Sequence, residues 1–410
     1  MAIKKGYKNY KSYQYLEERK DYKSFKLALE LDRVPEYLLP LSSEEEKRAE
    51  KIARDFIYIS LHEHVHIYPD DLSKFFLFAQ EGRERTAYEA LAHSNLDCVF
   101  DNLADGSCII TSKGGWKWED VLADLGMVLS DLAHQDFIFR CERIEDIYRA
   151  HKEERIAFVP SIEGAAPIEN ELDRIEILYG FGVRLMGITY SESNGLGSGL
   201  KEKGDGGLTA FGEKAVERMN KVGMAIDCSH TGIKTALDVI QTSTKPIFIS
   251  HVGAKGLWDS KRLAPDEVLL ACAKKGGVIG IEAAPHTTLT KNHPHHAIES
   301  YMEHFEYIKN LVGIDHLAFG PDTLYGDHVG LHHAFAEHLS MAAYAAQPSN
   351  TKKIESQQSF EEVPYVKGME NPTEASKNTI RWLVKHNYSD EEIKKVLSGN
   401  ILRVLEKVWR

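Results

Sequence analysis

At 410 residues the chain is long enough for one large α/β barrel or for two average domains, and 43% hydrophobic residues support a substantial core. The formal net charge of −12 argues against a nucleic-acid partner, because polyanion binding depends on clustered Lys and Arg. No apolar stretch approaches the roughly 20 residues needed to span a bilayer, so we expect no membrane partner.

The N-terminal segment, residues 1–55, is expected to be an extension that precedes the main domain. Its start is rich in Lys and Tyr and lacks the apolar segment of a signal peptide, so a cytoplasmic location is the default expectation. Ser42 and Ser43, followed by three glutamates, predict a helix start, since Ser caps helix N-termini and acidic residues are favourable in the first turn. This helix should run to about Asp55 and lead into a strand over Phe56–Leu61.

From residue 56 to 410, strand-like runs alternate with helix-like runs. Besides the strand that ends near His62, the expected strands are Ser107–Thr111, Ile156–Ile162, Val183–Thr189, Gly223–Cys228, Pro246–Ser250, Gly277–Ile281 and His316–Gly320. The expected helices are Glu169–Tyr179, Ala210–Val222, Ile233–Thr242, Asp266–Lys275, Ala297–Val312, Pro372–His386 and Ser389–Trp409, with a long polar loop over 340–371. Short buried strands separated by helices predict βαβ units and a parallel sheet. Eight such strands favour a closed (β/α)8 barrel of the TIM type over an open doubly wound sheet.

Histidines and carboxylates recur where these strands end. The candidate metal ligands are His62, His64, Glu163, His230, His251 and Asp322. In a parallel β/α barrel the carboxyl ends of the strands converge on one face, so these side chains are expected to meet there. A carboxylate that ends a buried strand must be paired or bound to metal, because an isolated buried charge is very costly. The alternative is a set of polar strand ends and ordinary ion pairs at the rim of the barrel.

Individual positions suggest different roles. His62 and His64 are two residues apart, so both face the same side of the sheet, whereas His66 lies where the chain should already turn away. Asp322, in Gly-Pro-Asp, can ligate a metal and also take a proton from bound water. Ser229 and Ser250 precede His230 and His251 but are not expected to act as nucleophiles, because adjacent strand residues point in opposite directions.

Other types of site are disfavoured. The five cysteines show no Cys-x-x-Cys spacing, so we expect small buried thiols rather than disulfides or a Cys zinc site. No glycine-rich dinucleotide motif follows a strand, and no Walker motif is present.

At these residues the chain resembles the membrane dipeptidase (renal dipeptidase, peptidase M19) family of the amidohydrolase superfamily. The resemblance covers roughly residues 56–408 and is specific, because several separated motifs occur in family order. The matching segments are Ser161–Gly164, Gly207–Gly212, Met219–Met224, Asp227–His230, Pro246–His251, Gly276–Gly280, Gly320–Asp322, Met369–Pro372, Tyr388–Ile393 and Gly399–Leu405.

The resemblance implies a hydrolase with two metal ions, expected to be Zn²⁺, that cleaves dipeptides. It places one metal on the first-strand motif and Asp322, the second on His230 and His251, and Glu163 between them. Asp322 would also act in proton transfer. Arg262 falls where the family has an arginine that binds the substrate carboxylate, a task that suits the guanidinium fork. The family also implies a homo-oligomer.

Three positions depart from the family pattern. The first motif is usually His-x-Asp, but this chain has His64 at the third position, which makes the site one charge more positive. Tyr190 stands where the family has a histidine that contacts the substrate carbonyl; it can donate one hydrogen bond and is expected to stabilise the oxyanion. Leu263 replaces an asparagine. These departures leave the exact substrate and the number of metals open.

The primary prediction is therefore a metallo-dipeptidase with Asp322 and Tyr190 in catalysis and Arg262 and Tyr190 in substrate binding. The alternatives are an amidohydrolase acting on another small amide, lactam or ester, and a non-catalytic barrel that acts as a binding or scaffold protein. Because metal ligation needs neutral imidazoles, activity is expected to collapse in mild acid.

Overall fold

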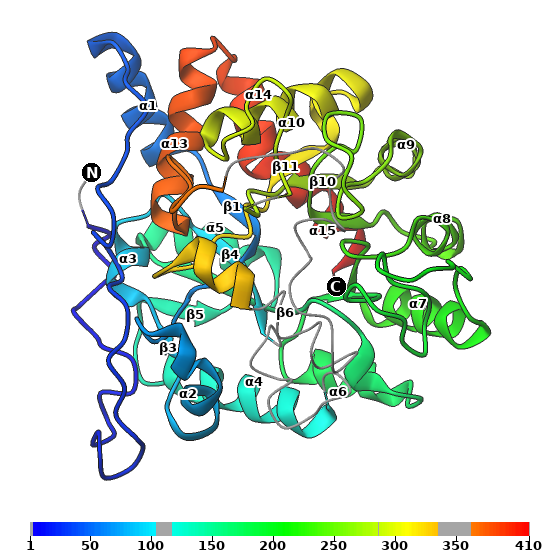
Figure 1. Cartoon of the computed structure of the whole chain (residues 1–410), viewed down its shortest axis with the longest axis horizontal. Helices are drawn as coiled ribbons and strands as arrows, with labels where there is room; N and C mark the ends of the chain where they lie inside the picture. The colour runs from blue at the N-terminus through cyan, green and yellow to red at the C-terminus, as the bar shows by residue number, and fades with distance from the viewer. Residues whose placement is uncertain (1–2, 104–116, 286, 335–361, 410) are drawn as a thin grey trace.

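The computed structural model describes residues 3–103, 117–285, 287–334 and 362–409. At its centre eight strands pair in parallel, in the order in which they occur along the chain. These strands are β1 (Ile59–Glu63), β4 (Cys98–Leu103), β6 (Ile156–Ile162), β7 (Leu185–Gly187), β8 (Ala225–Asp227), β9 (Phe248–Val252), β10 (Val278–Ile281) and β11 (Leu317–Phe319). Helices follow one another around the outside, as Figure 1 shows for α6 to α10. The predicted barrel of the TIM type is confirmed.

The ring of strands closes between β1 and β11, just beyond the regular ends of both strands. The backbone N–H of Asp322 donates to the carbonyl of His62 (3.2 Å), and that of His64 donates to the carbonyl of Thr323 (3.2 Å). The buried carboxylate of Glu63 accepts from the backbone N–H (2.9 Å) and the hydroxyl (2.7 Å) of Thr323. The seam of the barrel therefore lies beside His62, His64 and Asp322.

The first helix and the helices after residue 169 largely follow the sequence prediction, whereas the four helices between residues 75 and 153 were not predicted. Their bounds are α1 (Ser43–Asp55), α2 (Phe75–Glu81), α3 (Tyr88–Ala92), α4 (Trp118–Leu132), α5 (Ile144–Glu153), α6 (Asp173–Gly180), α7 (Ala210–Val222), α8 (Ile233–Thr242), α9 (Asp266–Lys274), α10 (Ile298–Val312), α13 (Pro372–Lys385), α14 (Asp390–Lys394) and α15 (Asn400–Val408). The start of α1 is fixed by a reciprocal capping box between Ser42 and Glu45, as the sequence indicated. The single helix predicted over Ser389–Trp409 is interrupted by a π-helical turn, Lys395–Gly399, between α14 and α15.

The second barrel strand differs from the prediction. The strand expected over Ser107–Thr111 lies outside the described residues, as does most of the loop predicted over 340–371. The strand that pairs with β1 and β6 is β4, which the sequence analysis did not identify. Asp101 and Asn102 are buried within β4, and these two polar residues break the apolar pattern by which a buried strand is recognised.

Smaller strands lie beside the barrel. β5 (Ile138–Arg140) pairs with the beginning of β6, whereas β7 pairs with its end. β2 (His66–Ile67) and β3 (Arg85–Thr86) form a short antiparallel pair. The described cysteines, Cys98, Cys141, Cys228 and Cys272, are buried free thiols as expected, and Cys108 lies outside the described residues.

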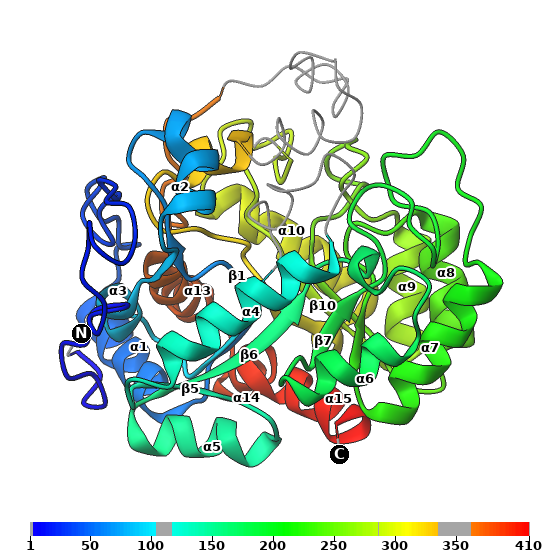
Figure 2. The ribbon, with the colours of Figure 1, turned by 90° about the horizontal axis from the view of Figure 1, so that it is seen from below.

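The two ends of the barrel differ in chemistry. At the N-terminal end, residues that begin the strands, such as Ile59, Leu185 and Val278, form one apolar cluster with residues of α15, including Ile401 and Leu405. Figure 2 shows α15 lying across the bottom of the molecule. This end is therefore sealed by apolar packing, and the polar strand ends lie at the opposite end of the barrel.

The N-terminal residues run along the outside of the barrel (left side of Figure 1). The buried carboxylate of Asp131, in α4, accepts from the hydroxyls of Tyr10 (2.7 Å) and Ser12 (2.5 Å) and from the backbone N–H of Tyr13 (2.7 Å). Farther along, Phe25 and Leu27 pack against an apolar cluster contributed by the segments that follow β1 and β11. Within the described ranges, no helix combines the length and apolarity needed to cross a bilayer.

Candidate metal centre

The structure brings together all six residues that the sequence analysis proposed as metal ligands. They come from five strands, β1, β6, β8, β9 and β11, and lie at or just beyond the carboxyl end of each. All six are at least nine-tenths buried. Their ligand atoms lie in two neighbouring groups at the mouth of the barrel.

The first group consists of His62, His64 and Asp322. Asp322 Oδ1 lies 3.2 Å from His62 Nε2 and 3.1 Å from His64 Nε2. The two imidazole Nε2 atoms are 3.3 Å apart. Three ligand atoms thus converge from the two strands that close the barrel.

The second group consists of Glu163, His230 and His251. Glu163 Oε1 lies 2.9 Å from His230 Nε2 and 3.2 Å from His251 Nε2. His62 of the first group lies close to the second group. Its Nε2 is 3.9 Å from Glu163 Oε1, and its ring centroid is 3.5 Å from that of His251. Within the second group, Glu163 therefore lies on the side that faces His62.

Hydrogen bonds behind the candidate ligands orient their imidazole rings. Ser250 donates from Oγ to Asp227 Oδ2 (2.6 Å), so its oxygen can accept from His251 Nδ1, 2.8 Å away. This arrangement protonates His251 at Nδ1 and leaves a lone pair on Nε2, which faces His230 Nε2 at 3.0 Å. The expectation that Ser250 and His251 point apart is wrong. The Ser250 hydroxyl is nevertheless held by Asp227 and supports the histidine.

Burial keeps the imidazoles neutral. It lowers the pKa of His230 and of His251 well below the usual 6.5, and the nearby Arg262 acts in the same direction. Burial also lowers the pKa of His62, opposed by Asp322. For Asp322 burial alone would raise the pKa, but His332, His62 and hydrogen bonds from the histidines hold it well below its usual value. Neutral imidazoles beside ionised carboxylate form a donor set suited to a divalent cation.

Two of the candidate ligands adopt a backbone conformation that is uncommon outside glycine. His230 and Asp322 both have φ of 59°. Such left-handed geometry costs roughly 1–2 kcal/mol for an ordinary residue and is concentrated at functional sites. On the neighbouring strand, a Cβ added at Gly187 would lie 2.0 Å from the carbonyl oxygen of Glu163, so only glycine fits against this ligand's backbone.

Glu282 is a site residue that sequence reasoning missed. It directly follows β10, is fully buried, and forms a third ligand group with His251 and Asp322. Burial raises the pKa of Glu282 to about 7, while Arg262 opposes that rise. The signal was the one that identified Glu163: an acidic residue at the end of an apolar strand.

Arg262 and Tyr190 lie beside the second group. Arg262 Nη2 forms an ion pair with Glu282 Oε2 (2.5 Å) and donates to the carbonyl of His251 (3.1 Å). The ring of Tyr190 stacks on that of His230 at 4.4 Å between centroids. Burial raises the pKa of Tyr190 well above 10, so its phenol stays protonated and able to donate.

The remaining histidines divide into structural and peripheral positions. His66 contacts Asp101 (3.2 Å) and belongs to none of the ligand groups found among the described residues. His332 Nε2 lies 3.0 Å from the carbonyl of Asp322, which brings it to the edge of the site. His328 is buried and close to the backbone N–H of Leu324.

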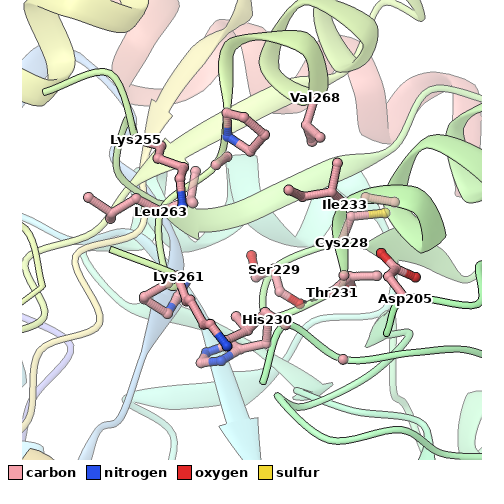
Figure 3. A pocket seen from close by; sticks show the side chains of 18 of the residues that line it. Asp205, Cys228, Ser229, His230, Thr231, Ile233, Lys255, Lys261, Leu263 and Val268 are labelled. Carbon is pink, nitrogen blue, oxygen red and sulfur yellow. Dashed lines mark hydrogen bonds between the residues drawn. The ribbon is translucent and has the colours of Figure 1, made fainter. Parts of the chain in front are cut away.

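A cavity of about 310 Å³ opens beside the second group. His230, Thr231, Lys261 and Arg262 are among its lining residues, and Figure 3 shows the lining side chains around His230. The cavity lies between the segment that links β8 to α8 and the segment that links β9 to α9. It gives a small molecule space next to the candidate ligands.

The donor set fits a pair of divalent cations. Four imidazoles and two carboxylates converge in a buried site, where the Nε2 atoms of His230 and His251 lie 3.0 Å apart and both face Glu163 Oε1. Nitrogen and oxygen donors of this kind suit Zn²⁺ and neighbouring divalent metals. The buried His, Glu and Asp groups are therefore consistent with a binuclear metal site.

Known proteins resemble this chain in fold. The structure of an amidohydrolase from Pseudomonas aeruginosa superposes with a TM-score of 0.71 and 24% identity, covering 88% of this chain and 99% of that one. A metallopeptidase from Rhodobacter sphaeroides, liganded with a phosphinate mimic of the dipeptide L-Ala-D-Ala, superposes with a TM-score of 0.64 and 17% identity, covering 87% and 100%. At these identities the likeness establishes the barrel fold.

The sequence comparisons are more specific. Dipeptidase aclJ of Aspergillus oryzae is 28% identical over 202 residues, which are 47% of this chain and 48% of that protein. Dipeptidase tcpJ of Claviceps purpurea is 24% identical over 278 residues, 67% of this chain and 56% of that protein. The chain thus spans about half the length of these curated relatives. Residues 47–339 match the family model of the membrane dipeptidases, peptidase family M19. The chain therefore belongs to the membrane dipeptidase family.

Proposed function

We propose that this protein is a zinc-dependent dipeptidase that hydrolyses the peptide bond of dipeptide-like substrates. The observation that carries the proposal is the convergence of six buried candidate ligands into two neighbouring groups, with Glu163 of the second group facing His62 of the first. His62, His64 and Asp322 would hold one ion, and His230 and His251 the other. A pair of zinc ions would lower the pKa of a bound water molecule and polarise the carbonyl of the substrate.

The protein's own residues would position the substrate and move protons. Asp322, ionised and at the edge of the first group, would accept the proton of the attacking water and deliver it to the leaving amine. Tyr190, protonated beside His230, would donate a hydrogen bond to the carbonyl oxygen as charge develops on it. Arg262 would anchor the C-terminal half of the substrate beside the cavity.

The test combines metal analysis with a substrate panel. Purified protein should contain about two zinc ions per chain and should cleave dipeptides among a set of L,L and L,D dipeptides, lactams, esters and N-acyl amino acids. His64→Gln should lower both metal content and activity. His66→Gln, a buried histidine outside the ligand groups, should retain the metal. Protein without stoichiometric metal would instead support a scaffold role.

A second candidate function is hydrolysis of another small amide, lactam or ester. The observation that favours it is the ion pair between Arg262 and Glu282, which occupies the guanidinium expected to bind a substrate carboxylate. Cleavage of lactams or esters from the same panel, without cleavage of any dipeptide, would establish this candidate.

A further inference from the structure

Glu282, which directly follows β10, lies among the candidate metal ligands. One of its carboxylate oxygens, a ring nitrogen of His251 and a carboxylate oxygen of Asp322 all lie within 4.8 Å of one another. The ligand atoms of His62, His64 and Asp322 meet the same limit, as do those of His62, Glu163 and His251. Glu282 therefore has the spacing to its neighbours that the sequence-predicted ligands have to theirs.

Glu282 approaches these ligands from the side of the barrel across from Glu163. The barrel strands pair in the order β1-β4-β6-β7-β8-β9-β10-β11, and the ring closes between β11 and β1. β6, which ends before Glu163, and β10, which ends before Glu282, are thus four positions apart in a ring of eight. Glu163 contacts His251 from one side, whereas Glu282 lies near both His251 and Asp322. Glu282 is therefore close to both groups of candidate ligands.

Neighbouring side chains hold the carboxylate of Glu282 in place. Its Oε1 lies 3.3 Å from the hydroxyl of Thr287 and 3.2 Å from that of Thr288. Its Oε2 forms the ion pair with Arg262 Nη2 (2.5 Å) but accepts no well-oriented hydrogen bond within the described ranges, although the residue is fully buried. Buried polar atoms nearly always have such a partner, and a carboxylate offers about four lone-pair positions. The carboxylate is thus fixed and buried, and it keeps the capacity to bind a cation.

The charges of the proposed site favour a further carboxylate. Two divalent cations would bring four positive charges. The six candidate ligands contribute the two carboxylates of Glu163 and Asp322 and four imidazoles, which are neutral when they bind metal. Arg262 adds another positive charge beside the second group. Uncompensated charge in a buried site is costly, and Glu282 supplies a third carboxylate close to the ligand atoms.

We propose that Glu282 is a further ligand of the metal pair and that it contacts the cations from the side across from Glu163. The inference rests on the zinc-dependent function proposed above and extends its ligand set to β10. It distinguishes Glu282 from a residue that only pairs with Arg262, because a metal ligand must approach an ion directly.

Zinc affinity gives the first test. Glu282→Gln keeps the size of the side chain but replaces a charged ligand by a neutral amide. The affinity for the more weakly bound zinc ion, measured by chelator competition without substrate, should therefore fall by about tenfold or more. Glu370→Gln is the matched control, because Glu370 is a buried glutamate paired with an arginine, Arg33 (3.0 Å), outside the ligand groups. This variant should bind zinc as the wild type does.

A crystal structure of the zinc-loaded wild-type protein gives the second test and does not depend on the folding of a variant. With zinc located by anomalous scattering, an oxygen of Glu282 should lie about 2.0–2.2 Å from an ion. The inference would be overturned by a distance above about 3 Å from every zinc ion, by a zinc affinity of folded Glu282→Gln within about threefold of wild type, or by a protein that takes up no zinc.

The two proposals can fail separately. Zinc bound through Glu282 without hydrolysis of any dipeptide would contradict the proposed function and leave this inference standing. Dipeptide hydrolysis by a zinc-loaded protein in which Glu282 contacts no metal would overturn the inference alone.

Discussion

His62 and Asp322 meet twice in this structure. The backbone N–H of Asp322 donates to the carbonyl of His62 (3.2 Å), and the side-chain Oδ1 of Asp322 lies 3.2 Å from Nε2 of the same histidine. The first contact closes the barrel between its first and last strands, and the second builds the first ligand group. The contact that closes the barrel and the contact that brings the first candidate ligands together therefore involve the same two residues.

Replacing Asp322 tests its two proposed roles. Asp322→Asn keeps the shape of the side chain but removes its charge and its ability to take a proton, so kcat should fall by about 10²–10⁴-fold. Metal bound by the first group should weaken, while far-ultraviolet circular dichroism stays unchanged. Asp327→Asn, which alters an aspartate paired with Arg33 away from the ligand groups, is the matched control. A kcat within about threefold of wild type would remove Asp322 from the reaction.

The pH dependence of metal affinity follows from the buried histidines. Their pKa values lie below 6.5, so protons compete with metal only at more acidic pH than for an exposed histidine. Zinc affinity should stay nearly constant as pH falls from 8 through 6.5 and should drop below that. The metal-free protein should lose stability in the same acidic range, because the unfolded imidazoles take up protons there and the folded ones do not. Chelator competition at a series of pH values measures the affinity, and a drop already between pH 8 and 7 would contradict the prediction.

Glu374, in α13, should make the protein less stable at neutral pH. It is buried, accepts from the backbone N–H of Tyr37 (3.2 Å), and burial raises its pKa to about 7. Between about 4.5, its unfolded value, and 7, the folded carboxyl keeps a proton that the unfolded one has lost, so stability falls as pH rises. In wild type the free energy of unfolding should therefore fall by about 3 kcal/mol between these pH values because of Glu374, and Glu374→Gln should abolish this fall. Urea unfolding at pH 4.5 and 7.5 checks this; equal differences from wild type at both pH values would refute it.

Asp131 should anchor the N-terminal residues to the barrel. Its carboxylate accepts from Tyr10, Ser12, Tyr13 and Tyr88, all at 3.0 Å or less. Asp131→Ala would leave these donors buried without a partner, which should cost about 3 kcal/mol or more. Trypsin should then cut faster within residues 3–41. Asp136→Ala, an exposed aspartate a few residues away, should change neither quantity. Unchanged trypsin resistance would mean that other contacts hold this segment.

Local features of the sequence were sufficient for much of the fold. The bounds of α7 and α8 were predicted at both ends, and the capping box at Ser42 follows from neighbouring residues alone. The positions of the candidate ligands could also be predicted, since each follows an apolar run and the carboxyl ends of parallel strands lie at one face of the barrel. By contrast β4 was missed, because the buried polar residues Asp101 and Asn102 interrupt its apolar pattern; Asn102 Nδ2 lies 2.5 Å from Nδ1 of the candidate ligand His62.

The sequence by itself thus determined the alternation of strands and helices and the place of each polar strand end, because periodicity, capping and chain order are local properties. Only the tertiary structure decided that Glu282 pairs with Arg262, that Asp227 supports His251 through Ser250, and that Asp131 holds the N-terminal residues. Those contacts join side chains from different strands and loops. Their distances depend on the register and closure of the whole barrel, which no single segment encodes.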